Sequence, residues 1–146
     1  MTHDARPSAI ACIHGGDAHP ALRGTVRFIP RGNATMVVAA ITGLPDTDSG
    51  FFALHIHEGG SCHGAGFPDT GGHYDPNGRE HPRHAGDLPS LLSNHGSAYL
   101  AVLTDRFQAG DVIGRTVVIH SQPDDFRSQP SGNAGSKIAC GVIRKI

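Results

Sequence analysis

Histidines are concentrated in one stretch of this sequence. Six of the eleven histidines lie between His55 and His84. Side chains two positions apart on a β-strand point to the same face, so His55 and His57 can present two imidazoles to one metal ion. The loop that follows carries a nitrogen-rich set with one carboxylate, formed by His73, His81, His84 and Asp87. This density of donors predicts a metal site and indicates more than one ion.

The donors divide into two sets that suit different metals. One set contains four imidazoles, which suit a tetragonal copper(II) ion: His55, His57, His73 and His120. The other set is one ligand short of a tetrahedral zinc site: His81, His84 and Asp87. A deprotonated imidazole can bind a metal at each nitrogen, so His73 can complete both sets. Pro82 and Gly86 favour a wrapped loop over a helix for the zinc set.

Length and composition predict one domain over residues 1–146, with enough mass to bury a core. The formal net charge of −1 gives no indication of a nucleic-acid or anionic-membrane partner. No apolar run approaches the roughly 20 residues that span a bilayer. The first residues contain no long apolar stretch of a secretory leader. The sequence as written therefore predicts a cytoplasmic protein, or a periplasmic or secreted one if the chain is a trimmed mature form.

Short strand-like runs separated by turn residues predict an all-β fold. We expect strands near 9–14, 22–29, 35–42, 52–57, 97–104, 116–121 and 137–142, with a tight hairpin turn at 30–33. No apolar repeat of 3.6 residues is long enough to predict a helix. Two long irregular segments, at about 58–96 and 121–136, contain the polar residues that chemistry requires. The pattern indicates a sandwich or barrel whose site is built mainly by loops.

The three cysteines, Cys12, Cys62 and Cys140, form no C-x-x-C pair, which argues against a cysteine zinc site or a thioredoxin-like motif. Cys12 lies in an apolar run and is expected to be a small buried thiol. A bridge between Cys62 and Cys140 would tie the histidine-rich loop to the barrel wall. The sequence alone does not establish this bridge, and a reducing cytosol argues against it.

The sequence resembles the copper/zinc superoxide dismutase family over about residues 8–144. The segments that carry the resemblance are LHIHE (54–58), GGHYDP (71–76), HAGDLP (84–89), GRTVVIH (114–120) and GNAGSKIACGVI (132–143). They are similar to the family's copper-binding strand, its bridging-histidine motif, the end of its zinc loop and its two C-terminal signatures. These motifs are highly specific.

The resemblance implies an eight-stranded Greek-key β-barrel, an immunoglobulin-like sandwich, with a long metal-binding loop and a trimmed electrostatic loop. It assigns copper to His55, His57, His73 and His120, and zinc to His73, His81, His84 and Asp87. It gives Asp124 the role of an outer carboxylate that links His55 to His81 and fixes their ring orientation. It also implies the disulfide between Cys62 and Cys140.

The activity that the resemblance implies is conversion of superoxide to dioxygen and hydrogen peroxide by redox cycling of copper beside a structural zinc. His73 would bridge the metals and carry a proton. Lys137, with Arg127 as a second candidate, would attract the superoxide anion through local positive potential. Family members occur as dimers and as monomers, so a homodimer stays open.

Three features depart from the family pattern. Lys137 stands where the family usually has arginine, which keeps the charge but loses the planar fork that orients an anion. The segments 81–84 and 120–137 are short, which removes charged surface that steers superoxide. Phe52 and Ala53 replace the usual glycine-containing approach to the copper strand. All metal ligands remain, so we expect activity that is retained but lowered.

Two other classes of function fit the same residues. The chain would be a non-catalytic or weakly active copper/zinc storage or delivery protein if it binds both ions without dismutation. It would be a structural or interaction β-sandwich if its histidines bind no metal tightly. Metal content and a dismutation assay distinguish the three.

Overall fold

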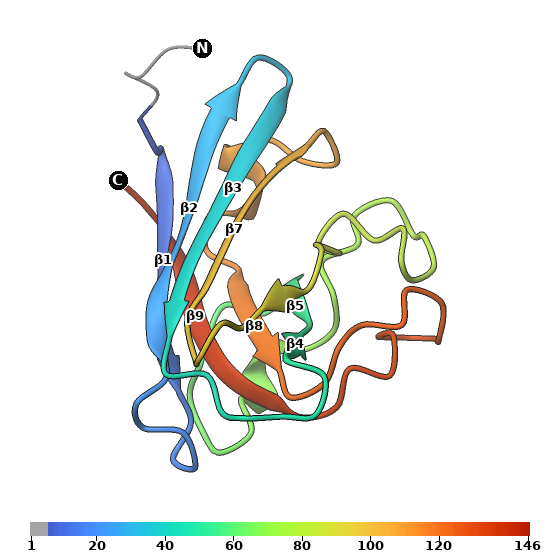
Figure 1. Ribbon diagram of the computed structural model, residues 1–146. Helices are drawn as coiled ribbons and strands as arrows, with labels where there is room; N and C mark the ends of the chain where they lie inside the picture. Colours follow the sequence, from blue (N-terminus) through green and yellow to red (C-terminus); the bar gives the residue numbers. More distant parts are fainter. Residues whose placement is uncertain (1–5) are drawn as a thin grey trace.

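The computed structural model describes residues 6–146 (Figure 1). It contains nine β-strands: β1 (Ala9–Gly15), β2 (Arg23–Arg31), β3 (Ala34–Thr42), β4 (Phe51–Phe52), β5 (Leu54–His57), β6 (Leu91–Leu92), β7 (Ala98–Thr104), β8 (Thr116–His120) and β9 (Lys137–Lys145). The helical elements in this part of the chain are two short 3-10 turns, η1 (Pro68–Thr70) and η2 (Ala109–Val112). The all-β prediction is therefore confirmed. No helix among the described residues is long and apolar enough to cross a membrane.

The strands form one curled antiparallel sheet of seven, in the order β5-β8-β9-β1-β2-β3-β7, and a two-stranded sheet, β4-β6. A bridge between Asn94 and Ser97 leads from β6 into β7. Only Ala53 separates β4 from β5, so the small sheet continues the curl back toward β5. When β4 and β5 are counted as one interrupted strand, eight strands follow the barrel pattern that the resemblance implies. This order places β2 four strands from β5 in either direction.

The hairpin between β2 and β3 forms where the turn residues predict it. Arg31 pairs with Ala34, which leaves Gly32 and Asn33 as a two-residue turn. Gly32 has a positive φ of 59°, a conformation that tight hairpin turns require at a central residue and that glycine adopts without steric cost. This turn sets the register in which Val26 and Phe28 of β2 face the core.

The interior of the curled sheet is a continuous apolar core. Its largest fully buried members are Phe28, Phe52, Leu22, Ile41, Leu54, Ile56, Leu91, Ile119 and Ile143. Each buried side chain of this size contributes about 1.5–3 kcal/mol to folding. Leu54, Ile56 and Ile119 belong to β5 and β8, so the core holds in place the two strands from which three of the predicted ligands come.

Two details of the chain differ from the sequence-based expectation. The strand expected at 52–57 is interrupted at Ala53, because its N–H donates to Gln122 O and its carbonyl accepts from His120 N. The burial predicted for Cys12 is wrong, since Cys12 is exposed. Alternation along β1 turns Ala11 and Ile13 to the core and Cys12 outward.

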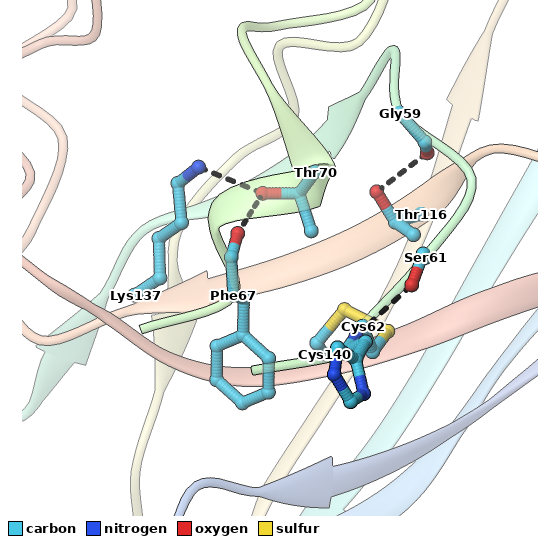
Figure 2. Close-up of a disulfide and its surroundings, with 9 residues drawn as sticks. Gly59, Ser61, Cys62, Phe67, Thr70, Thr116, Lys137 and Cys140 are labelled. Carbon is cyan, nitrogen blue, oxygen red and sulfur yellow. Dashed lines mark hydrogen bonds between the residues drawn. A yellow bond between two sulfur atoms is a disulfide. The ribbon is translucent and has the colours of Figure 1, made fainter. Parts of the chain in front are cut away.

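The disulfide that the resemblance implies is present between Cys62 and Cys140 (Figure 2). It links the segment that follows β5 to the middle of β9. Cys140 is completely buried and packs with Phe67 and Val118 in a small apolar cluster outside the main core. The disulfide therefore fixes the start of the histidine-rich loop to the wall of the sheet.

Candidate metal centre

Strands β5 and β8 deliver three of the histidines to one place. They pair antiparallel with Leu54 opposite Ile119, which brings His55 and His57 of β5 near His120 at the end of β8. His73 reaches the same place through an isolated bridge to His57. Donor atoms of His55, His57, His73 and His120 lie within 4.8 Å of one another, and all four residues are buried. The sequence prediction that His55 and His57 share a face holds, because Leu54 and Ile56 fill the core on the other side.

Hydrogen bonds fix which ring nitrogens of this group are free. His57 Nδ1 lies 2.8 Å from Gly71 O and His120 Nδ1 lies 3.4 Å from Gly135 O. A carbonyl oxygen only accepts, so each of these nitrogens carries the proton. The two Nε2 atoms then hold lone pairs, and they lie 3.2 Å apart. Two facing lone pairs in a buried place repel one another unless a cation lies beside both.

Asp124 fixes two further rings in the same way. His55 Nε2 donates to Asp124 Oδ2 at 2.7 Å, and His81 Nε2 donates to Asp124 Oδ1 at 2.8 Å. These are the contacts that the resemblance implies for Asp124. The remaining nitrogen of each ring, Nδ1, is buried and has no hydrogen-bond partner among the described residues. Such orphaned acceptors fit metal ligands whose orientation a carboxylate controls.

A second group of donors converges around Asp87. Its Oδ1 lies 2.8 Å from His73 Nδ1, and its Oδ2 lies 3.1 Å from both His81 Nδ1 and His84 Nδ1. His84 Nδ1 is also 3.2 Å from His73 Nδ1. The other nitrogen of His73, Nε2, is buried and meets no hydrogen-bond partner within residues 6–146. His73 therefore faces Asp87 with Nδ1, and its Nε2 is available to bind a metal ion. Three imidazoles and one carboxylate suit zinc, and the four imidazoles suit copper.

The loop that carries His81 and His84 is held by side chains that the sequence did not single out. Gln129 Oε1 accepts from His81 N at 3.0 Å and Gln129 Nε2 donates to His81 O at 2.6 Å. Arg106 Nη1 donates to Pro82 O at 2.7 Å and to His84 O at 3.1 Å. Neither residue belongs to a motif or a spacing pattern, so no signal in the sequence identifies them.

A glycine leaves room for the Asp124 contacts. Gly132 has a φ of +76°, and a Cβ there would overlap Asp124 Oδ1 and approach His81 Nε2 to 2.6 Å. Gly132 lies in the GNAG stretch that contributes to the resemblance. The structure thus explains this glycine by both its backbone conformation and the space it leaves.

Burial controls the protonation of the donors. It lowers the pKa of His57 to about 2 and that of His120 to about 3, so both rings are neutral and can bind a metal at neutral pH. Burial alone would raise the pKa of Asp124, but hydrogen bonds from His55 and His81 outweigh it and lower this pKa to about 2. Asp124 is therefore an anion that accepts hydrogen bonds from both rings.

Lys137 contacts the segment that leads to His73, and Figure 2 shows its side chain directed toward Thr70. Its Nζ donates to Thr70 Oγ1 at 2.7 Å and to Gly71 O at 3.1 Å. Gly71 O is also the acceptor for His57 Nδ1. Thr70 is fully buried, and its hydroxyl donates to Phe67 O at 2.8 Å, which leaves the oxygen lone pairs for Lys137. Burial lowers the pKa of Lys137.

Arg127, the second cation that the sequence suggested, lies in an exposed turn. Its backbone N–H donates to Asp125 Oδ1 at 2.9 Å. No contact joins its side chain to the donor groups in the part of the chain that the structure describes. Of the two cations that the sequence suggested, Lys137 is thus the one that hydrogen bonds connect to the metal centre.

Comparison with known proteins agrees with this geometry. The sequence model of the family described as "Copper/zinc superoxide dismutase (SODC)" matches residues 22–143. The chain is 36% identical to "Superoxide dismutase [Cu-Zn] 2" of Aquifex aeolicus (strain VF5), over 83% of this chain and 78% of the relative. It is 32% identical to "Superoxide dismutase [Cu-Zn] 1" of the same organism, over 83% of this chain and 79% of the relative.

Proposed function

This chain belongs to the copper/zinc superoxide dismutase family, and we propose that it converts superoxide to dioxygen and hydrogen peroxide at a copper ion bound next to zinc. The observation that carries the proposal is the pair of facing lone pairs on His57 Nε2 and His120 Nε2, 3.2 Å apart and buried. They lie beside the orphaned nitrogens of His55 and His73.

In this proposal copper is held by His55 Nδ1, His57 Nε2, His73 Nε2 and His120 Nε2. Zinc is held by His73 Nδ1, His81 Nδ1, His84 Nδ1 and Asp87. The second group of donor atoms that lie within 4.8 Å of one another contains His55, His73, His81 and Asp87, with His55 in the place of His84. We assign the fourth zinc ligand to His84 because Asp124 occupies His55 Nε2, and the one free nitrogen of His55 serves the copper set.

The protein residues would position the metal ions, transfer a proton to the product and attract the anionic substrate. Copper, when bound, supplies the one-electron acceptor and donor that the two halves of dismutation require. His73 Nε2, buried and without a protein partner, is the nitrogen that can take up a proton and give it to the reduced product. Asp87 holds the opposite side of the same ring at 2.8 Å, which keeps Nε2 directed toward the other three histidines.

Lys137 would draw the superoxide anion to this place. The fixed ammonium lies beside the copper set, and its contacts with Thr70 and Gly71 prevent it from swinging into solvent. An ammonium bound in this way offers a point charge, whereas an arginine would offer a planar fork. We therefore expect a rate limited partly by anion capture.

The test of the proposal is metal content and superoxide-dependent activity on one preparation reconstituted with copper and zinc. We expect one copper and one zinc per chain with rapid turnover. Both metals with turnover no faster than free copper would instead support a storage or delivery protein. Binding of zinc without copper would show that the four-histidine set does not assemble as proposed.

The role of Lys137 has its own test, because the chain contains only one other lysine, Lys145. Lys137→Gln should lower kcat/KM about tenfold at low ionic strength and flatten its salt dependence. Lys145→Gln is the matched control and should change neither. Lys137→Arg should raise the rate at low ionic strength. An unchanged or lower rate for Lys137→Arg would mean that loop geometry, not the side chain, limits anion capture.

A further inference from the structure

Positive charge is concentrated on strands that lie away from the metal centre. Arg23, Arg27 and Arg31 follow one another at intervals of four residues along β2. Val26 and Phe28 between them are buried in the core, so the three arginines share the outer face. At about 3.3 Å per residue, the row spans roughly 26 Å. None of the nine strands in the described residues contains Asp or Glu.

A fourth arginine widens the row. Strand β1 lies between β2 and β9, and its Ile10 pairs with Arg27 on one side and with Arg144 on the other. Arg27 and Arg144 therefore lie on the same face, across one strand from each other. We use the name arginine row for Arg23, Arg27, Arg31 and Arg144.

The charge of this row is not neutralised within the protein. In residues 6–146, every carboxylate within 4.0 Å of a basic nitrogen is paired with a histidine, and none with an arginine or a lysine. The Nε atoms of Arg27 and Arg31 are buried against the sheet and meet no acceptor in this range. Their stems are thus packed in place, and the charge of each guanidinium is left for an external anion.

We propose that the arginine row binds a linear polyanion that carries phosphate groups, namely polyphosphate. Guanidinium groups bind phosphate and sulfate oxygens through paired hydrogen bonds. Three of the four arginines lie along a single strand of a curled sheet, which matches a chain more closely than a flat lipid surface. Single-stranded nucleic acid is disfavoured because its bases stack on aromatic side chains, and β1, β2 and β9 expose no Phe, Tyr or Trp.

The position of the row suits attachment without obstruction of the metal centre. Strand β2 is four strands from β5 in either direction around the sheet. In Figure 1, β1 and β2 lie at the left, whereas the loops at about 75–90 and 121–136 extend at the right. A polymer on the arginine row would therefore leave the histidine groups open to small molecules.

The test is binding of fluorescent polyphosphate, with heparin as the sulfated alternative and orthophosphate as the monomeric control. We expect polyphosphate to bind in a salt-dependent manner and more tightly than heparin, and orthophosphate to bind far more weakly. Arg27→Gln with Arg31→Gln removes two charges but keeps long stems for packing. This double variant should weaken binding at least about tenfold at low salt and reduce the slope of log affinity against log salt by about 1.5.

The matched control is Arg79→Gln with Arg83→Gln, which removes two exposed charges from the loop that carries His81 and His84. Thermal unfolding establishes that both double variants are folded. Equal losses in the two variants would overturn the proposal, because binding would then reflect net charge. Tighter binding of heparin, of single-stranded DNA or of anionic phospholipid vesicles than of polyphosphate would also overturn it, as would occupation of the face by a second copy in sedimentation.

Discussion

The two sides of the metal centre are supported in different ways. His55, His57 and His120 project from paired strands whose opposite faces fill the core. His81, His84 and Asp87 lie in irregular chain. Their loop is positioned by hydrogen bonds from Gln129, Arg106 and Asp124. The copper side is thus a product of strand packing, whereas the zinc side depends on contacts between loops.

The two sides should therefore respond differently to amino-acid substitutions. A change on the strand side acts through the ligand itself, because the core maintains the backbone. A change on the loop side can act at a distance, because the backbone of His81 lies outside the strands and is held by the side chain of Gln129. His73 and Asp124 belong to both sides and should couple them.

His73→Ala should have the largest effect, because it removes the ring shared by both sides. We expect losses of zinc and copper affinity greater than the roughly 10- to 100-fold that an outer carboxylate contributes. Metal competition titrations and the copper absorption spectrum measure both. His63→Ala, a change to an exposed histidine of the same loop, is the control. Unchanged zinc affinity and copper spectrum in His73→Ala would show that the two sides do not share this ligand.

Asp124→Asn should affect both sides less strongly. The amide keeps one acceptor oxygen but presents an NH2 group to the second imidazole N–H, so one of the two rings loses its orientation. We expect about a 10- to 100-fold weaker affinity for at least one metal. Isothermal titration with each metal measures it. Asp125→Asn, which changes the exposed neighbouring carboxylate, should leave both affinities within error of the parent protein.

Gln129→Leu should weaken zinc binding without a comparable effect on copper binding. Loss of the paired hydrogen bonds to His81 should weaken zinc binding by about tenfold, as expected for about 1.4 kcal/mol of lost hydrogen bonding. Copper binding at the strand-supported histidines should change little. Gln122→Leu is the control for loss of an exposed glutamine in the same segment. Equal weakening of both metals would mean that the loops support the copper side as well.

The smallest effect is expected in the pH dependence of the unfolding free energy of the metal-free protein. The folded pKa values of His57 and His120, about 2 and 3, lie below the ordinary value of 6.5. The unfolded chain thus binds these protons first, and stability is present above pH 6.5 and lost as the pH falls toward 3. The free energy of unfolding should decrease by about 1.4 kcal/mol per pH unit for each ring. Urea unfolding between pH 7 and pH 4 measures the slope.

A variant sharpens the same measurement. His120→Gln removes one of the two buried rings and should make the slope shallower by about one proton's contribution. His63→Gln, at an exposed position, is the control. If the unfolding free energy of the unsubstituted protein had the same slope against pH as that of His120→Gln, the pKa of the His120 ring would not be lowered by folding.

The sequence determined the strand side almost completely. The two-residue period of β5 places His55 and His57 on one face whatever the rest of the chain does, and the apolar run before His120 predicts a buried strand that ends at a ligand. The all-β class followed from short apolar runs and turn residues such as Gly32 and Asn33. The motif resemblance supplied the Cys62–Cys140 bridge, which spacing alone left open.

The contacts that position the zinc loop and Lys137 could not be predicted from the sequence and are seen only in the tertiary structure. The hydrogen bonds of Gln129 and Arg106 to the zinc loop join residues 48 and about 22–24 positions apart, and no local pattern encodes such pairings. The exposure of Cys12 likewise depends on which face of β1 meets the core. Local periodicity fixes the direction of a side chain along a strand, but contacts between loops arise only when the folded sheet brings distant segments together.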